Sequence, residues 1–116
     1  MTLKGKPVVA YLQGPRERFW GILRSLDPSG AMIEGVEADH FESWARQVAR
    51  EGENAPAASI VFFPSARIER LLLDRSSRAV PSLEDRFRGI TGKTLTAYLG
   101  GSRPVRSVPF PKSRRD

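Results

Sequence analysis

The stretch from Pro7 to Glu37 constrains the fold most, because it encodes three consecutive β-strands separated by two turns. Apolar, β-branched and aromatic residues, which favour a pleated and half-buried surface, dominate three runs. These runs are residues 8–13, 19–26 and 31–37. Gly14-Pro15 breaks the chain after the first run. Asp27-Pro28-Ser29-Gly30 follows the second run and suits a type I turn, since its Asp can bond the backbone two residues on and Pro fixes its own φ.

The middle strand is apolar on both of its sides. Phe19, Gly21 and Leu23 point to one side, whereas Trp20 and Ile22 point to the other. A strand that is buried on both faces and contains a glycine usually bends sharply, because glycine lacks the Cβ that would clash at the corner. The sequence therefore predicts a small, strongly bent barrel with Gly21 at its corner.

An amphipathic helix is predicted at residues 38–51, after the third strand. Its apolar residues recur at positions i, i+3, i+4 and i+7, and they are Phe41, Trp44, Ala45 and Val48. Asp39 is predicted to cap its N-terminus and Gly52 to end it. Two roles fit this helix. Its aromatic residues close an open end of the barrel, or its surface binds a protein partner.

Two more strands are predicted at residues 59–63 and 67–74, separated by Pro64-Ser65-Ala66. Alternation along the fifth strand places Ile68 and Leu72 on one side, and Leu71 and Leu73 on the other. The fourth strand is so apolar that it would promote aggregation if its edge were bare. We therefore expect this strand to be covered by its own chain or paired with a neighbouring copy.

The remaining chain is predicted to be helical and then extended. Ser82 suits a helix N-cap with Asp85 three residues later, and short helical pieces follow up to residue 99. The predicted organisation is a barrel at residues 1–78 with the helical insertion 38–51, a helical appendage at 79–99, and a flexible basic tail at 100–116.

Composition limits the class of protein. The chain has 116 residues, enough for one domain with a modest core, and no cysteine, which excludes disulfides and thiolate metal sites. The N-terminal residues lack the long apolar run of a signal peptide or a membrane span. We therefore expect a cytoplasmic protein that does not associate with membranes.

Positive charge is concentrated at the C-terminal end. Residues 1–99 hold 14 Lys and Arg against 12 Asp and Glu, whereas residues 100–116 hold 5 against 1. A short basic tail can neutralise phosphates and bind nucleic acid in a salt-dependent way. Alternatively, the tail only keeps the protein soluble.

Nothing in the sequence predicts an enzyme. Residues 89–94, GITGKT, are similar to a phosphate-binding loop, but Phe87 stands where that loop requires its first glycine. His40 is the only histidine, so neither a metal site of the usual kind nor an activated serine is predicted. We expect no catalytic residue, no metal and no cofactor.

The first hairpin resembles the first signature segment of Sm and LSm-like proteins, including bacterial Hfq. The residues that carry the resemblance are Gly21, Leu23, Asp27 and Gly30. Together with residues 59–74, it extends over the five predicted strands. Family members are bent five-stranded barrels that usually close into rings and bind RNA. The resemblance implies a mainly β fold, an SH3-type, Sm-like barrel that forms a homo-oligomeric ring.

In that family the fourth strand of each subunit pairs with the fifth strand of the next subunit. The predicted interface residues here are Ile60, Val61, Phe62, Ile68 and Leu71. The family's uridine pocket is missing, because Ala31 replaces its Asn, and Phe62-Phe63-Pro64 replaces the Arg-Gly of Sm proteins or the Tyr-Lys-His of Hfq. The resemblance therefore implies single-stranded RNA binding with low sequence specificity.

Two kinds of residue are candidates for that binding. Phe62 or Phe63 stacks a base, or both fill the core and the subunit interface. The cations predicted to contact phosphates are Arg67, Arg103, Arg106, Lys112, Arg114 and Arg115. The competing hypothesis is a protein-interaction module that uses helix 38–51 and the C-terminal helix, without nucleic acid.

Overall fold

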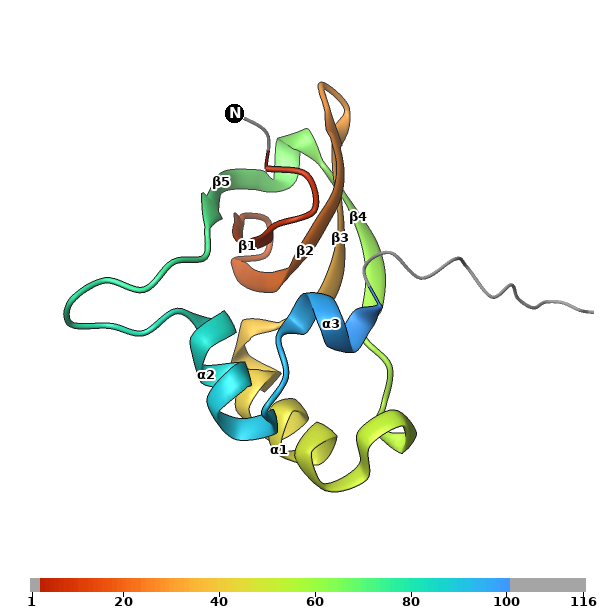
Figure 1. Cartoon of the computed structure of the whole chain (residues 1–116). Helices are drawn as coiled ribbons and strands as arrows, with labels where there is room; N and C mark the ends of the chain where they lie inside the picture. Colours follow the sequence, from red (N-terminus) through yellow and green to blue (C-terminus); the bar gives the residue numbers. More distant parts are fainter. Residues whose placement is uncertain (1–2, 101–116) are drawn as a thin grey trace, which may run out of the picture.

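The structure is a computed structural model that describes residues 3–100. It contains five strands, three α-helices and three short 3-10 helices (Figure 1). The strands are β1 (Pro7–Leu12), β2 (Glu17–Asp27), β3 (Gly30–Glu37), β4 (Ser59–Pro64) and β5 (Ile68–Leu73). The helices are η1 (Ala38–His40), α1 (Phe41–Glu51), η2 (Gly52–Asn54), η3 (Ser65–Arg67), α2 (Leu83–Thr91) and α3 (Leu95–Leu99). The five predicted strands and the helix of residues 38–51 are confirmed.

The strands form one antiparallel sheet in the order β4-β3-β2-β1-β5. This order confirms that β4 and β5 lie at opposite edges. The expected barrel is not closed, since β4 and β5 do not pair with each other within residues 3–100. Instead, η3 crosses between the edges: the Ser65 N–H donates to the Ser29 carbonyl (2.9 Å), and the Gln13 N–H donates to the Arg67 carbonyl (2.8 Å).

Two glycines allow β2 and β3 to approach each other closely. Gly21 is directly opposite Gly35 in the register of these strands. A Cβ on Gly21 would lie 2.2 Å from the Glu34 carbonyl oxygen, and one on Gly35 would lie 1.9 Å from the Trp20 carbonyl oxygen. Gly21 therefore stands where no side chain fits, as predicted, but its partner Gly35 was not recognised from the sequence.

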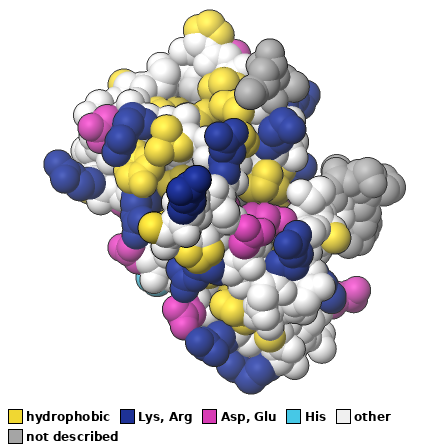
Figure 2. All heavy atoms as spheres, turned by 60° about the vertical axis from the view of Figure 1, so that its left-hand side comes forward, with side chains coloured by type: hydrophobic (Ala, Val, Ile, Leu, Met, Phe, Trp, Pro, Cys, Tyr) yellow, Lys and Arg dark blue, Asp and Glu magenta, His cyan; other side chains and the backbone are white. Residues whose placement is uncertain are grey.

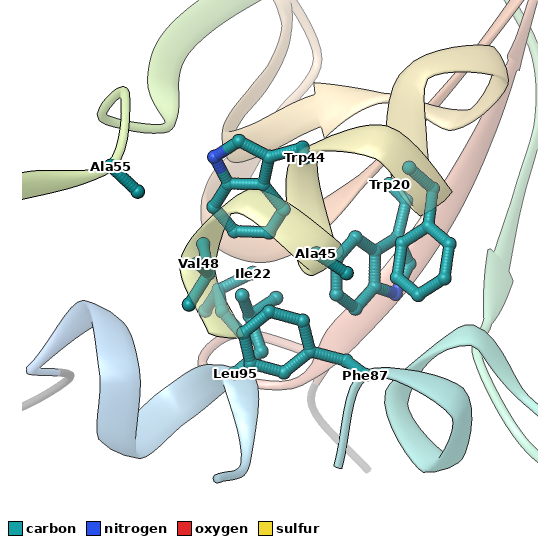
Figure 3. Packing of buried hydrophobic residues seen from close by; sticks show 9 residues of the cluster. Trp20, Ile22, Trp44, Ala45, Val48, Ala55, Phe87 and Leu95 are labelled. Atoms are coloured by element: carbon teal, nitrogen blue, oxygen red, sulfur yellow. The ribbon is translucent and has the colours of Figure 1, made fainter. Parts of the chain in front are cut away.

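The outer face of the sheet, defined as the side that carries Trp20 and Ile22, is covered by the helices around these two residues (Figures 1 and 3). The four predicted apolar residues of α1 are all buried there. The Trp20 ring meets Phe41 edge-to-face, with 5.0 Å between the ring centroids. Phe87 of α2 stacks on Trp44 at 5.4 Å. The helices therefore form a second layer that shares one aromatic core with the sheet.

The inner face holds a separate core. Its buried residues are Val8, Ala10, Leu12, Phe19, Leu23, Ala31, Ile33 and Phe63. Ile68 and Leu71 both pack against it, so their predicted placement on opposite sides of β5 is wrong. The register shifts from Tyr11 opposite Arg70 to Leu12 opposite Ile68, and the skipped residue forms a bulge that reverses the alternation.

Asp74, at the end of β5, ties the sheet to the start of α2. Its carboxylate accepts hydrogen bonds from the Trp20 indole (2.9 Å) and from the backbone N–H groups of Leu83 (3.1 Å) and Glu84 (2.8 Å). Ser82 caps the same helix as predicted, because its hydroxyl accepts from the Asp85 N–H. Between these two points the chain makes an extended excursion from the body of the molecule (Figure 1).

The predicted cap of α1 is wrong. The short helix η1 already occupies residues 38–40, so His40 and not Asp39 is the residue that precedes α1. The His40 side chain makes no capping hydrogen bond. The Asp39 carboxylate instead lies 3.3 Å from the Arg18 guanidinium of β2. The cost of an uncapped start is small here, since the buried apolar face of α1 holds the helix in place.

Candidate functional site

The two phenylalanines predicted to stack a base lie on opposite faces of β4. Phe63 is only 5% exposed, and its ring packs edge-to-face on Phe19 at 5.1 Å. Its assignment to RNA binding is therefore corrected: Phe63 belongs to the inner core. Phe62 points to the outer face and is 47% exposed, so its ring is accessible.

Arg67, the cation predicted to hold a phosphate from the body of the protein, is engaged by the β1–β2 turn. Its Nε donates to the Gln13 carbonyl (3.0 Å), and its Nη2 donates to the Pro15 carbonyl (2.7 Å). Nη2 also lies 3.6 Å from a Glu17 carboxylate oxygen. Arg67 therefore stabilises the turn, which corrects its assignment. The other predicted cations, Arg103, Arg106, Lys112, Arg114 and Arg115, lie outside the described residues.

The predicted motif residues of the first hairpin have structural roles. The Asp27 carboxylate accepts hydrogen bonds from the Ser29 N–H (2.8 Å) and from the Ser29 hydroxyl, and these bonds lower the pKa of Asp27. A Cβ on Gly30 would lie 2.2 Å from the Phe63 carbonyl oxygen. Leu23 is fully buried in the inner core. The four residues therefore shape the hairpin, and the exposed Asp27 carboxylate is engaged by Ser29.

The two sheet edges expose apolar side chains on the outer face. Ile60 and Phe62 of β4 are 61% and 47% exposed, and Leu72 of β5 is 42% exposed. Val61 and the predicted interface residues of β5, Ile68 and Leu71, instead pack toward the inner core. Leu72 was not among the predicted interface residues, although its predicted placement opposite Leu71 and Leu73 is correct; the bulge in β5 changes only the side of Ile68.

The helix 38–51 offers little apolar surface to a protein partner. All of its large apolar side chains pack onto its own sheet. Its exposed side carries charges, including Glu42, which pairs with Arg46 (2.7 Å) and Arg86 (3.0 Å). The bond from Arg46 and the charges of both arginines lower the pKa of Glu42. Of its two predicted roles, covering the sheet is the one that its packing fits.

A row of three side chains crosses the outer face of β2, β1 and β5. Tyr11 is directly opposite Arg18 on one side and Arg70 on the other. The Arg70 guanidinium lies over the Tyr11 ring, 4.4 Å from its centroid. The row separates two hollows of about 410 and 530 Å³, both lined by Tyr11 and Arg18. We call the row and these hollows the arginine groove.

More cations line the arginine groove. Arg16 and Arg70 belong to the smaller hollow, and Arg75 and Arg86 to the larger one. Val9, Leu72 and Val80 give the larger hollow an apolar lining. Figure 2 turns this side of the molecule forward and shows Lys and Arg side chains around a hydrophobic patch. Basic, aromatic and apolar groups thus meet here, a combination suited to a nucleic-acid strand.

Two kinds of site were looked for in the described part of the chain and not found: a cluster of metal ligands and a membrane-spanning helix. Residues 3–100 contain no cluster of three or more His, Asp or Glu side chains that could hold a metal ion. His40 is exposed, and its Nδ1 lies 3.4 Å from Glu37. None of the helices in this range combines the length and the apolar composition needed to span a bilayer.

The chain was compared with models of protein families, with curated proteins and with solved structures. No family model, curated protein or solved structure matches it. The sheet edges and the arginine groove are therefore the features of this chain that point to a function.

Proposed function

We propose that this protein is an Sm-like module that assembles with copies of itself through β4 and β5 and binds single-stranded RNA with low sequence specificity. The observation that supports this proposal best is the open five-stranded sheet, in which β4 and β5 are the two edges. Each edge presents backbone N–H and C=O groups on its free side, which favour pairing with another strand.

The exposed apolar residues support pairing between β4 of one copy and β5 of the next. Ile60 and Phe62 on β4 and Leu72 on β5 all lie on the outer face. When two edges join, outward-pointing residues of the paired strands remain on one side of the continuous sheet. Pairing β4 with a neighbour's β5 therefore brings these side chains together and removes part of their surface from water. Repetition of this contact around an axis gives a closed ring.

Charge supports RNA as the ligand of the assembly. The chain has a net charge of +6, and most of the excess lies in residues 100–116. Cations that neutralise phosphates provide affinity without reading the base sequence. Low specificity follows because the residues that form the family's uridine pocket are absent from this sequence.

Assembly is tested with Ile60→Lys, which places a charge on the β4 edge. We expect the wild-type protein to have an oligomeric mass by light scattering at micromolar concentration, and Ile60→Lys to shift it toward the monomer. Leu26→Lys is the matched control, since Leu26 is 54% exposed but does not lie on an edge strand. A monomeric wild-type mass would contradict the assembly.

RNA binding is tested by titration of uridine- and adenine-rich oligomers at two salt concentrations. The slope is that of the logarithm of the binding constant against the logarithm of the salt concentration. If the five cations of residues 103–116 each engage a phosphate, they contribute about −3.5 to this slope. Deleting residues 103–116 should remove that contribution and change the base preference little. Absence of binding at low salt would contradict an RNA function and favour a protein-interaction module.

A further inference from the structure

The arginine groove contains a preformed stack of the Arg70 guanidinium over the Tyr11 ring. Tyr11 is half-buried and fixed in β1, whereas Arg70 is exposed above its ring. Side chains that stand directly opposite each other on a sheet are held in register by the strands. A guanidinium held flat against an aromatic ring loses less conformational freedom on binding than a free arginine does.

We propose that single-stranded RNA crosses the outer face of β2, β1 and β5 in the arginine groove and stacks a base on the Tyr11–Arg70 pair. This inference rests on the proposed RNA function and assigns its binding site to residues outside the basic tail. Bases that are splayed out of a single strand stack on aromatic rings and on the planes of arginine guanidinium groups. The base extends the existing stack.

Phosphate contacts come from arginines on either side of the row. Arg16 lines the smaller hollow and Arg75 the larger one. Within residues 3–100, neither side chain has an acidic partner within ion-pair distance. A strand that passes over Tyr11 therefore meets an unpaired cation before and after the stacked base. Arg18, at the centre of the groove, is paired with Asp39.

The acidic residues of the groove are mostly neutralised by their own contacts. Glu17 lies 3.6 Å from Arg67, and Asp39 lies 3.3 Å from Arg18. Asp74 accepts three hydrogen bonds from the Trp20 indole and the start of α2. Glu69 is exposed and remains as the one acid of the two hollows without such a contact among the described residues. Within residues 3–100, Arg16, Arg70 and Arg75 are therefore the groove cations that no ion pair engages.

The groove is compatible with the proposed assembly. Edge pairing uses the free backbone groups of β5, which lie in the plane of the sheet. Tyr11 and Arg70 stand on the outer face, roughly perpendicular to that plane. An incoming strand from another copy therefore leaves the stack open to RNA.

The stack is tested by fluorescence anisotropy of a labelled single-stranded RNA of mixed sequence, with the full-length protein. Loss of base stacking by Tyr11→Leu or Arg70→Ala should weaken binding about tenfold. Tyr11→Phe keeps the ring and should bind as the wild type does. Arg50→Ala, which removes an exposed cation of α1 without an ion-pair partner among the described residues, is the matched charge control and should remain close to wild type.

Two further variants separate stacking from charge. Arg70→Lys keeps the positive charge but lacks the planar group, so affinity should fall while the salt slope is unchanged. Arg16→Ala should reduce the magnitude of the slope by about 0.7, the share of one phosphate contact on a single strand. Only variants whose melting temperature and solution mass equal those of the wild type are compared. If Tyr11→Leu does not fold, the exposed Arg70 variants decide the result.

The outcomes distinguish this inference from the proposed function. If wild-type protein binds RNA and the Arg70 variants bind as tightly as Arg50→Ala, the site lies elsewhere, although the RNA function stands. If deletion of residues 103–116 abolishes all binding and the Arg70 variants change nothing, the site belongs to the tail. If wild-type protein does not bind at low salt, both the function and the site are wrong.

Discussion

The two faces of the sheet are completed in different ways. On the outer face, Trp20 and Ile22 are fully buried beneath helices of the same chain. On the inner face, the core is mostly aliphatic and lies between β4 and β5, which do not pair with each other within residues 3–100. The middle of the outer face is thus covered by helices, whereas the buried inner core contains no residue of a described helix. This difference indicates that stability comes mainly from the outer core and that the edges are available for assembly.

The largest expected effect comes from a substitution in β2, the strand that contributes residues to both cores. Gly21→Val would drive a branched side chain into the backbone of β3, where the nearest oxygen is only 2.2 Å from the new Cβ. We expect a loss of more than about 3 kcal/mol of unfolding free energy, measured by urea denaturation, because backbone cannot move aside. The matched control is Gly89→Ala in α2, where a Cβ meets open space. It should stabilise the protein by about 0.5–1 kcal/mol.

An unchanged denaturation midpoint for Gly21→Val would show that β2 and β3 can separate at this point. The close approach of Gly21 and Gly35 would then not hold the two cores together. A destabilising Gly89→Ala would instead show that α2 is strained or packed more tightly than its open side indicates.

A pair of identical substitutions compares the two cores directly. Phe87 is fully buried in the outer core, where its ring contacts Trp20, Trp44 and Tyr98. Phe63 is 5% exposed in the inner core, and among residues 3–100 its ring contacts only that of Phe19. Truncation of a buried phenylalanine typically costs about 3–5 kcal/mol. We expect Phe87→Ala to fall at the upper end of that range and Phe63→Ala at the lower end, in thermal or urea unfolding.

The reverse order would contradict the view that the outer core dominates stability. It would mean that the inner core, despite its open boundary, contributes more to the folded state. As a control, the unfolding of both variants is measured at several protein concentrations. Assembly through β4 would make their free energy of unfolding depend on concentration.

The next effect concerns the residue that fastens the helical layer to the sheet. Asp74→Ala removes the acceptor of the Trp20 indole and of two N–H groups at the start of α2. Unsatisfied donors and the lost charge at the helix N-terminus should together cost about 2–3 kcal/mol. The tryptophan fluorescence should change as well, because the Trp20 indole loses its carboxylate partner. Asp39→Ala is the control, since its carboxylate has one exposed ion pair. It should cost less than about 1 kcal/mol.

If Asp74→Ala and Asp39→Ala were equally mild, the contact between β5 and α2 would not hold the outer layer in place. The packing of Phe87 alone would then account for the position of α2. If both were severe, the β2–η1 contact of Asp39 would be a second fastening point.

More of the fold than of the candidate site could be predicted from the sequence. Strand positions and the helix of residues 38–51 follow from local periodicity, which strand and helix geometry impose directly. The bulge in β5 depends on the pairing register of Tyr11 and Leu12, which no local pattern contains. The same limit explains why Phe63 and Arg67 were misplaced: their partners Phe19 and Gln13 lie more than 40 residues away in the chain.

The arginine groove illustrates why a site can escape sequence analysis. Tyr11, Arg18 and Arg70 are separated in the chain and meet only in a cross-strand row. One signal was available: Tyr11 alternates with the core residues of β1 and therefore faces outward. The motif residues Gly21, Leu23, Asp27 and Gly30 gave no signal for this site, because they shape the first hairpin.

The smallest effect concerns the pH dependence of the helical layer. Burial raises the pKa of Glu84, an effect that the hydrogen bond from the Leu95 N–H only partly offsets. The folded protein thus binds a proton at Glu84 more tightly than the unfolded chain does. The stability from this group is fully present below the unfolded pKa and is lost as pH rises through the folded pKa.

Glu84→Gln removes this titration and keeps an oxygen that can accept from Leu95. We therefore expect the free energy of unfolding of the variant minus that of the wild type to increase as pH rises above 4.5, the ordinary pKa of a glutamate, and then to level off. Glu42→Gln is the control of opposite sign, because ion pairing with Arg46 and Arg86 lowers the pKa of Glu42. Its contribution is present above the unfolded pKa and is lost as pH falls through the folded pKa. Both stability differences are measured from the midpoints of urea denaturation of the wild type and each variant between pH 3.5 and 7. A flat difference for Glu84→Gln would show that Glu84 remains hydrated between α2 and α3, and that the outer layer is less tightly closed than the Trp20 core beneath it.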